Sequence, residues 1–127
     1  MTSPHILVVD DEEANRRIAQ LLLEHAGYTV SQAASGGEAL VMQSMQAFDL
    51  MLLDLSMPET SGFEVCAQIL DQYPAKRPVL VAYTAHVLPA ELSAVHAAGF
   101  DDVLIKPVSR SGLLECMQRW TGGASRG

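Results

Sequence analysis

The stretch Ile6-Leu7-Val8-Val9-Asp10-Asp11-Glu12-Glu13 carries the strongest indication of the fold. Its first four residues are apolar, without the alternation of a strand that has one face in water. They therefore predict a parallel strand that is covered on both faces. The last four residues are acids placed directly after this strand. Ligands of open α/β sheets bind outside the carboxyl ends of the strands, so these acids are candidate site residues.

Four more apolar runs follow along the chain, and stretches with a helical spacing of apolar residues separate them. In the first two helical stretches, the residues expected to face the core are Ile18, Leu21, Leu22 and Ala26, and Ala39, Leu40, Met42 and Met45. Strand alternating with helix five times predicts an α/β fold with one parallel sheet and right-handed crossovers. The further strand runs are 28–30, 50–53, 79–83 and 103–105.

The length and composition restrict the class of protein. A chain of 127 residues fits a single domain over 1–127, expected to have its core at about 5–120 and a flexible tail at 121–127. Fifteen acidic and eight basic side chains give a net charge of −7, which disfavours binding to nucleic acid or to a membrane surface. The sequence has only two cysteines and no secretory signal, and no apolar run approaches the roughly 20 residues that span a bilayer. These features favour a cytoplasmic protein with reduced thiols.

Polar side chains follow the other predicted strands at the same edge of the sheet. Asp54 comes after the third strand, Thr84 after the fourth, and Lys106 and Pro107 after the fifth. Each has an ordinary explanation when taken alone, such as a helix cap, a turn or a solvated loop lysine. Their joint placement is better explained by a site at the carboxyl edge of the sheet.

The charges of this predicted site favour a bound cation. Asp10, Asp11 and Asp54 would bring three negative charges together, and Lys106 would return one positive charge. A set of oxygen ligands without histidine or cysteine suits Mg²⁺, for which Mn²⁺ can substitute. A carboxylate beside a metal ion, a lysine and a hydroxyl suits phosphoryl transfer, and Asp54 is the natural acceptor because it lies in the middle of the set.

These motifs resemble the receiver domain of two-component response regulators over nearly the whole chain, from about residue 6 to residue 120. The resemblance implies a flavodoxin-like fold, a doubly wound five-stranded parallel sheet of order 2-1-3-4-5 with five helices. No single motif is specific, but their order on successive strands is. The matching segments are 8–12, 52–64, 83–85 and 101–107.

The resemblance also implies the role of each residue around the metal. Asp54 would accept a phosphoryl group from a histidine kinase or from a small donor such as acetyl phosphate. Asp11 would bind Mg²⁺ directly, with Asp10 helping, often through water. The backbone carbonyl of Ser56 would be a further ligand of the metal.

Other implied roles concern the phosphoryl group. Thr84 would move toward one phosphoryl oxygen and Lys106 would pair with another, while the bond from Lys106 to Pro107 would be cis. Ser56 and His86, two residues after Asp54 and Thr84, would flank the path of the attacking water. We expect them to tune the rate of autodephosphorylation.

The sequence departs from the family pattern at one position of the switch. The family often has Tyr or Phe three residues before the lysine, and Val103 stands there. Tyr83 is not a replacement for it, because its side chain should point to the opposite face of the strand from Thr84. The run Asp10-Asp11-x-x-x-Asn15-Arg16 resembles the corresponding run in receivers of hybrid kinases and phosphorelays more than the one in receivers of transcription factors.

Three functions remain as alternatives. The first is a phosphorylation-controlled switch that binds a protein partner, or a second copy, through its fourth helix, fifth strand and fifth helix. The second is a phosphorelay receiver, or one excised from a hybrid kinase or larger regulator, which passes its phosphoryl group to a histidine phosphotransfer protein. The third is a Mg²⁺-dependent aspartyl phosphatase, which is disfavoured because Ser56 stands where the second acid would be. The chain is therefore expected to catalyse only its own phosphorylation and dephosphorylation.

Overall fold

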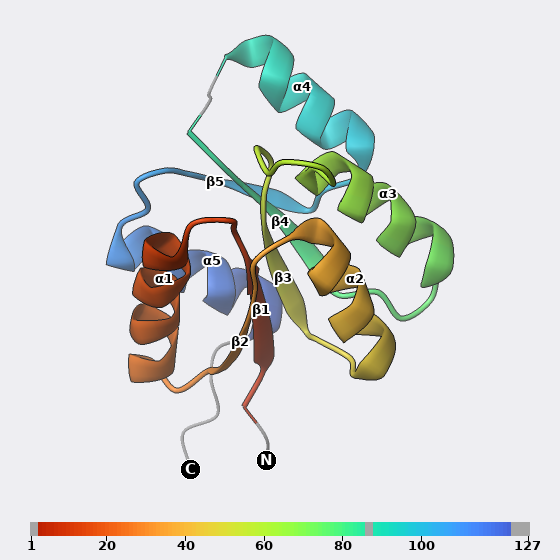
Figure 1. The fold of residues 1–127 in the computed structure, drawn as a ribbon. Coiled ribbons are helices and arrows are strands. Elements are labelled where there is room, and N and C mark those ends of the chain that lie inside the picture. The colour runs from red at the N-terminus through yellow and green to blue at the C-terminus, as the bar shows by residue number, and fades with distance from the viewer. Residues whose placement is uncertain (1–2, 86–87, 123–127) are drawn as a thin grey trace.

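In the computed structural model, which describes residues 3–85 and 88–122, strand and helix alternate along the whole chain (Figure 1). The strands are all parallel and lie in the order β2-β1-β3-β4-β5, which confirms the predicted sheet with its five helices. The elements are β1 His5–Val9, α1 Glu13–His25, β2 Thr29–Ala33, α2 Gly36–Met45, β3 Leu50–Asp54, α3 Gly62–Gln72, β4 Val79–Thr84, α4 Pro89–Ala98, β5 Asp102–Ile105 and α5 Arg110–Thr121.

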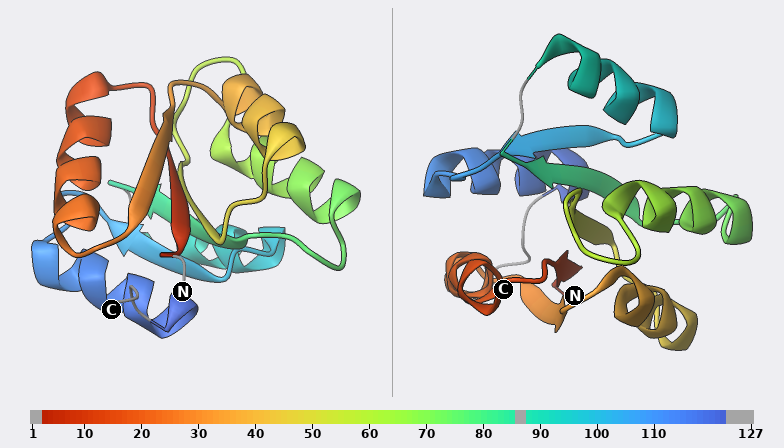
Figure 2. Two further views of the ribbon diagram at one scale, coloured as in Figure 1. Left: turned by 90° about the horizontal axis from the view of Figure 1, so that it is seen from below. Right: turned by 45° about the horizontal axis from the view of Figure 1, so that its top comes forward.

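The sheet separates two apolar cores, because successive side chains of a strand point to opposite faces. Ile6 and Val8 of β1 pack with α1 and α5, whereas Leu7 and Val9 pack with α2, α3 and the inner side of α4. Figure 2 shows one layer of helices on each face of the sheet. This double burial explains why β1 is apolar after His5 and β3 is apolar before Asp54.

Strand β2 is longer than its predicted apolar run, which ended at Val30. It continues through Ser31 and Gln32 to Ala33, in register with β1. An edge strand tolerates such polar residues because one side of it faces solvent. Here the Ser31 hydroxyl also lies 2.7 Å from His5 Nε2.

The apolar stripes predicted for the first two helices were partly wrong. The side chains of Ile18, Leu21 and Met45 are 55%, 62% and 78% exposed. Helix α1 meets the sheet through Ala19 and Leu23, which were not in the predicted stripe, and through Ala26, which was. A small residue such as Ala19 lets the helix backbone approach the sheet closely, so side-chain size alone misplaced the buried face.

At the C-terminus, α5 extends to Thr121 and ends at Gly122, whose φ of +78° is a left-handed conformation that favours glycine. The remainder of the expected tail, residues 123–127, lies outside the described residues. None of the helices in the described part of the chain has the length and apolar character needed to cross a membrane.

Candidate functional site

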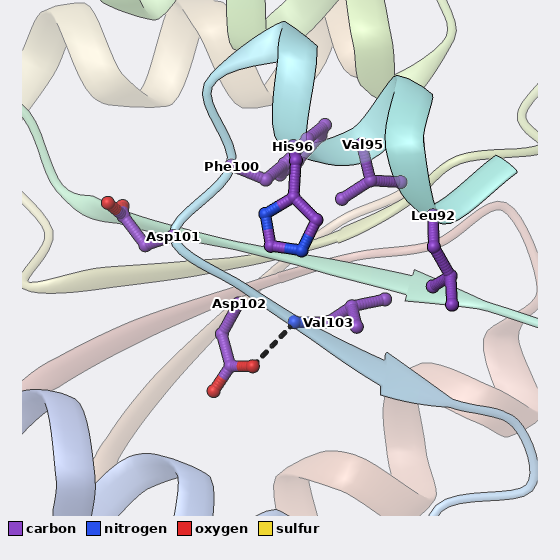
Figure 3. A pocket seen from close by; sticks show the side chains of 7 residues that line it. All are labelled: Leu92, Val95, His96, Phe100, Asp101, Asp102 and Val103. Atoms are coloured by element: carbon purple, nitrogen blue, oxygen red, sulfur yellow. Dashed lines mark hydrogen bonds between the residues drawn. The ribbon is translucent and has the colours of Figure 1, made fainter. Parts of the chain in front are cut away.

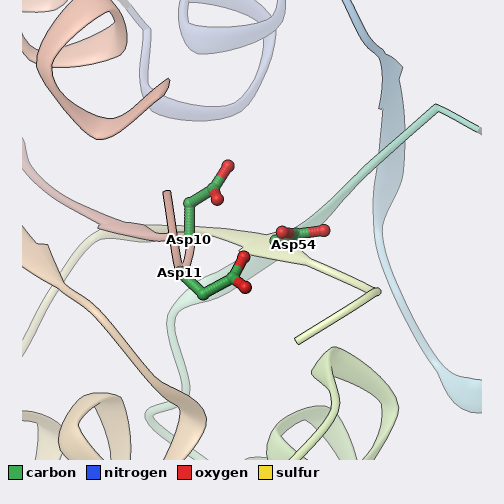
Figure 4. A group of neighbouring side chains, drawn as sticks. All are labelled: Asp10, Asp11 and Asp54. Carbon is green, nitrogen blue, oxygen red and sulfur yellow. The ribbon is translucent and has the colours of Figure 1, made fainter. Parts of the chain in front are cut away.

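The pairing of β1 with β3 brings three aspartates together. Val9 is in register with Leu53, so the residues that follow them, Asp10 and Asp54, lie side by side where the strands end. Carboxylate oxygens of Asp10, Asp11 and Asp54 all lie within 4.8 Å of one another (Figure 4). Asp10 and Asp54 are buried and Asp11 is exposed. The cluster therefore has two fixed carboxylates at its base and one that faces the solvent.

Backbone N–H groups fix the two buried carboxylates. The Glu12 N–H donates to Asp10 Oδ1 at 2.9 Å, and the Ser56 N–H donates to Asp54 Oδ1 at 3.0 Å. Both are contacts to a residue two positions further on, the local pattern that aspartate makes readily in turns. Each aspartate thus keeps its Oδ2 atom for other partners.

Lys106 reaches both of these oxygens from the end of β5. Its Nζ atom lies 3.2 Å from Asp10 Oδ2 and 3.3 Å from Asp54 Oδ2. The Lys106 N–H donates to the Thr84 carbonyl at 2.8 Å, which fixes the lysine backbone beside the end of β4. Lys106 is therefore in direct contact with two of the three predicted acids. Asp10, Asp11, Asp54 and Lys106 together carry a formal charge of −2.

Burial and charge shift the pKa values of this cluster. Burial raises the pKa of Asp54, and the charge of the neighbouring Asp10 raises it further. The Ser56 N–H and Lys106 lower this pKa, but the net shift is upward. Burial opposes the charged form of Lys106, but the carboxylates of Asp54 and Asp10 outweigh it and raise the lysine pKa. The lysine is therefore a fixed positive charge, and the aspartates gain from additional positive charge.

The residues present fit a magnesium ion. Asp10 Oδ2 is buried and, among the described residues, has the Lys106 ammonium as an ion-pair partner but no well-aligned hydrogen bond. An oxygen ligand set with a surplus of negative charge and an exposed side, at Asp11, matches the preference of Mg²⁺ for carboxylates and retained water. Among the described residues, Asp10, Asp11 and Asp54 form the one group of three or more Asp, Glu, His or Cys side chains close enough together to hold a metal ion.

Thr84 lies at the other end of the site, under α4. Its side chain is buried and lines a cavity of about 280 Å³ together with Ser56, Phe63 and Ala90. The bond from Lys106 to Pro107 is cis. His86 lies outside the described residues.

The position of the usual aromatic residue lies on the same side of the sheet as Thr84. Val103 faces α4 and lines a cavity of about 70 Å³ with Leu92, Val95 and Phe100 (Figure 3). Tyr83, as expected, points to the opposite face and packs in the core beneath α1 and α5.

Three neighbours of the site were given no role in it from the sequence. Arg16 donates through Nη1 to the Asp10 carbonyl at 2.8 Å. A Cβ atom on Gly62 would lie 2.5 Å from the Asp54 carbonyl oxygen, so the start of α3 is packed directly on the acceptor residue. The ring of Tyr83 lies under the Lys106 ammonium, with Nζ 4.8 Å from the ring centroid. Gly62 and Tyr83 had a signal in the sequence, because they belong to the matching segments 52–64 and 83–85.

Comparison with known proteins finds one family that matches nearly the whole chain. The family model of the response regulator receiver domain matches residues 6–118. The CAI-1 autoinducer sensor kinase/phosphatase CqsS of Vibrio cholerae is 36% identical over 116 residues, which are 91% of this chain and 17% of that protein. The aerobic respiration control sensor protein ArcB of Escherichia coli is 36% identical over 117 residues, 91% of this chain and 15% of that protein. The chain thus spans less than a fifth of the length of either relative.

Solved structures share the fold over nearly their whole length. The chemotaxis response regulator CheY4 of Vibrio cholerae superposes with a TM-score of 0.87 at 32% identity, covering 93% of this chain and 98% of that one. The receiver domain of the sensor histidine kinase PA1611 from Pseudomonas aeruginosa superposes with a TM-score of 0.86 at 30% identity, covering 96% and 100%. That structure has a magnesium ion coordinated in its active site cleft.

Proposed function

Since the chain belongs to the response regulator receiver domain family, we propose that Asp54 is its phosphoacceptor and that Mg²⁺ is its cofactor. It is a receiver domain of the two-component type, a family that includes the receivers of hybrid sensor kinases. The observation that carries the proposal is the contact of Lys106 with both Asp10 and Asp54 beside the exposed Asp11. This arrangement places a carboxylate nucleophile next to the charges that a phosphoryl group requires.

In the proposed reaction an Asp54 carboxylate oxygen attacks the phosphorus atom. The bond between phosphorus and the nitrogen or oxygen of the donor breaks, and the donor leaves with the electron pair. Lys106 pairs with one phosphoryl oxygen, and the Thr84 hydroxyl donates a hydrogen bond to another. Mg²⁺, held by Asp10, Asp11, Asp54 and the Ser56 carbonyl, would supply the positive charge that neutralises the phosphoryl oxygens.

Phosphorylation then acts as a switch through α4. Of the residues of this helix, Val95 alone is buried, and cavities of about 280 Å³ and 70 Å³ lie beside Thr84 and Val103 along it. A helix packed this loosely can shift when Thr84 moves toward the phosphoryl group. The aromatic side chain usual at position 103 is then not required.

The output of the switch is a protein contact. The face formed by α4, β5 and α5 carries the exposed apolar side chains of Leu88 and Ile105, 64% and 40% exposed. We propose that a downstream partner, or a second copy of the chain, binds this face when α4 has shifted. The Thr84→Ala variant should then accept the phosphoryl group without the change in partner affinity.

A phosphorelay role is the second candidate, and the hybrid-kinase relatives favour it. In this role a histidine phosphotransfer protein, rather than a binding partner at α4, takes the phosphoryl group from Asp54. A phosphatase acting on external substrates is not favoured, because Ser56 supplies no acid for the leaving group. In either role we propose a cytoplasmic location, supported by Cys66 and Cys116, which are free thiols buried on opposite faces of the sheet.

Intact mass after incubation with acetyl phosphate and Mg²⁺ tests the proposal. The expected result is a gain of one phosphoryl group in the wild type and none in Asp54→Asn or in EDTA. Lack of any gain, together with lack of binding of the phosphoryl mimic fluoroberyllate, would overturn it. Adding a histidine phosphotransfer protein to the labelled chain separates the two roles, because rapid transfer to that protein is expected for a relay alone.

A further inference from the structure

Tyr83 is an aromatic residue whose ring lies against a charged side chain of the site, the ammonium of Lys106. It is buried, at 6% exposure, at the carboxyl end of β4 and on the face opposite to Thr84. Its ring lies beneath the Lys106 ammonium, whose Nζ atom is 4.8 Å from the ring centroid. This distance is within the range of about 6 Å in which a cation is attracted to the face of an aromatic ring.

We infer that Tyr83 is a positioning residue for Lys106, which holds the ammonium at the phosphoryl-binding edge of the site through its ring. Among the described residues, the Lys106 ammonium contacts the Tyr83 ring and the carboxylates of Asp10 and Asp54. The inference rests on the proposed phosphorylation of Asp54, and it adds a residue on the far side of the sheet to that machinery.

A bound Mg²⁺ ion would compete with Lys106 for the aspartates, but it would not compete for the Tyr83 ring. When Mg²⁺ binds the aspartates, it neutralises the charges that attract the lysine, and the two ion pairs weaken. Without another partner, the long and flexible lysine side chain would gain rotamers that turn away from the site. The Tyr83 ring keeps its attraction unchanged, so it holds Lys106 where a phosphoryl oxygen can meet it.

The surroundings of the ring support this role. Tyr83, Lys106, Pro107 and Val108 line the same cavity, of about 430 Å³, which is open beside Ile18 of α1. A lysine released from the ring would have this space to enter. The contact with the Tyr83 ring therefore favours the lysine conformation directed at Asp54 over one directed into this open cavity.

Two substitutions separate the ring from the hydroxyl group. Tyr83→Phe keeps the ring, and Tyr83→Leu keeps apolar bulk without a ring. Tyr28→Leu is the matched control, because Tyr28 is also buried in the core beneath α1 and α5 but at the other end of the sheet. The expected loss of fluoroberyllate affinity in the presence of Mg²⁺ is about fivefold in Tyr83→Leu, the factor that a cation–ring contact supplies. We expect less than about twofold loss in Tyr83→Phe and Tyr28→Leu, since both keep that contact.

Nuclear magnetic resonance detects the contact without any phosphoryl chemistry. The chain has two lysines, Lys76 and Lys106, so selective ¹³C labelling gives two sets of side-chain signals, and Lys76→Met assigns them. We expect the Lys106 methylene protons next to the ammonium to be shifted upfield by the ring in the wild type and in Tyr83→Phe. In Tyr83→Leu, they should move to the position of an ordinary lysine.

The two readouts fail in different ways. Unshifted Lys106 protons in the wild type, or equal fluoroberyllate affinity in Tyr83→Leu and Tyr83→Phe, would overturn the positioning role. If the wild type neither gains a phosphoryl group nor binds fluoroberyllate, the proposed function fails, and the lysine chemical shifts alone decide whether the ring holds Lys106.

Discussion

The indole N–H of Trp120 donates a hydrogen bond of 2.8 Å to Asp102 Oδ2, and so ties the last turn of α5 to the first residue of β5. Asp102 also accepts the Val103 N–H at 2.8 Å and meets Arg119 Nη1 at 2.5 Å. The Arg119 side chain is mostly exposed, so its ion pair contributes little. The bond from the Trp120 indole therefore joins the helix to the strand of the proposed output face, and the Val103 N–H orients the Asp102 carboxylate within β5.

Removing this carboxylate should loosen α5. We expect Asp102→Ala to lower the free energy of unfolding by about 1–3 kcal/mol, because the partly buried N–H groups of Val103 and Trp120 lose their acceptor. Urea unfolding followed by the fluorescence of Trp120, the only tryptophan in the sequence, measures the loss. Asp71→Ala, an exposed acid on α3, is the control and should change stability by less than about 0.5 kcal/mol. Equal stability of the two variants would contradict the role given to Asp102.

Asp101 should make stability depend on pH. Burial raises its pKa, but the Arg77 guanidinium and the Leu80 N–H outweigh burial and hold the pKa below its ordinary value. Arg77 makes two contacts with the carboxylate, at 2.7 and 2.8 Å. A lowered pKa in the folded state contributes stability above the ordinary carboxyl pKa of about 3.9, and that contribution is lost as the pH falls through the folded value.

The Asp101→Asn variant isolates this contribution from those of the other acids. At pH 7 we expect it to be less stable than the wild type by about 1.5–3 kcal/mol, the worth of hydrogen bonds to a charged group. The difference should shrink below about pH 4, where the wild-type carboxylate takes up its proton. Urea unfolding at a series of pH values measures it, and a difference independent of pH would show that the charge of Asp101 is not what stabilises the fold.

The parts of this structure that were predicted from sequence share one physical basis. Strands β1, β3 and β4 are buried on both faces, so each contains a run of at least four apolar residues that is easily found. Parallel strands end at one edge of a sheet, and this rule alone brought Asp10, Asp54 and Lys106 together. Strand β2, at the edge of the sheet, is partly polar and was predicted too short.

The features that were not predicted depend on side-chain geometry. Nothing in the order of residues says that Lys106 would lie almost equally close to two carboxylates and above the Tyr83 ring. Nor does apolar spacing reveal that α1 packs through Ala19 while Ile18 stays exposed. The periodicity of a sequence identifies a helix, but the rotation of the helix about its axis is set by packing against its neighbours.

Lys106 and a bound cation should substitute for each other in stabilising the site. Lys106→Met leaves Asp10 and Asp54 buried without their positive partner, so we expect a loss of up to about 3 kcal/mol in the absence of Mg²⁺. Added Mg²⁺ should restore stability, by about 2.7 kcal/mol at a hundred times its dissociation constant. Its effect should be larger in the variant than in the wild type, because the site is one charge more negative.

Unfolding in urea with and without Mg²⁺ measures this exchange. Lys76→Met, at the exposed lysine of the chain, is the matched control and should respond to Mg²⁺ as the wild type does. An equal stabilisation by Mg²⁺ in Lys106→Met and Lys76→Met would show that the lysine and the cation act on different groups.

Gly62 should be required because the start of α3 is packed against the backbone of the acceptor. In Gly62→Ala the new Cβ atom would lie 2.5 Å from the Asp54 carbonyl oxygen, so the end of β3 or the start of α3 must move. We expect a loss of stability of about 1–3 kcal/mol from this overpacking. A slower gain of phosphoryl mass from acetyl phosphate should accompany it, because Asp54 moves with its backbone.

Gly37 offers a matched control in the first turn of α2. A Cβ atom there would have nothing within 4 Å, so Gly37→Ala should stabilise the helix by about 0.5–1 kcal/mol and leave phosphorylation unchanged. Urea unfolding and intact mass on both variants give the comparison. If Gly62→Ala behaves as Gly37→Ala does in both measurements, the close packing of α3 on Asp54 has no part in holding the acceptor in place.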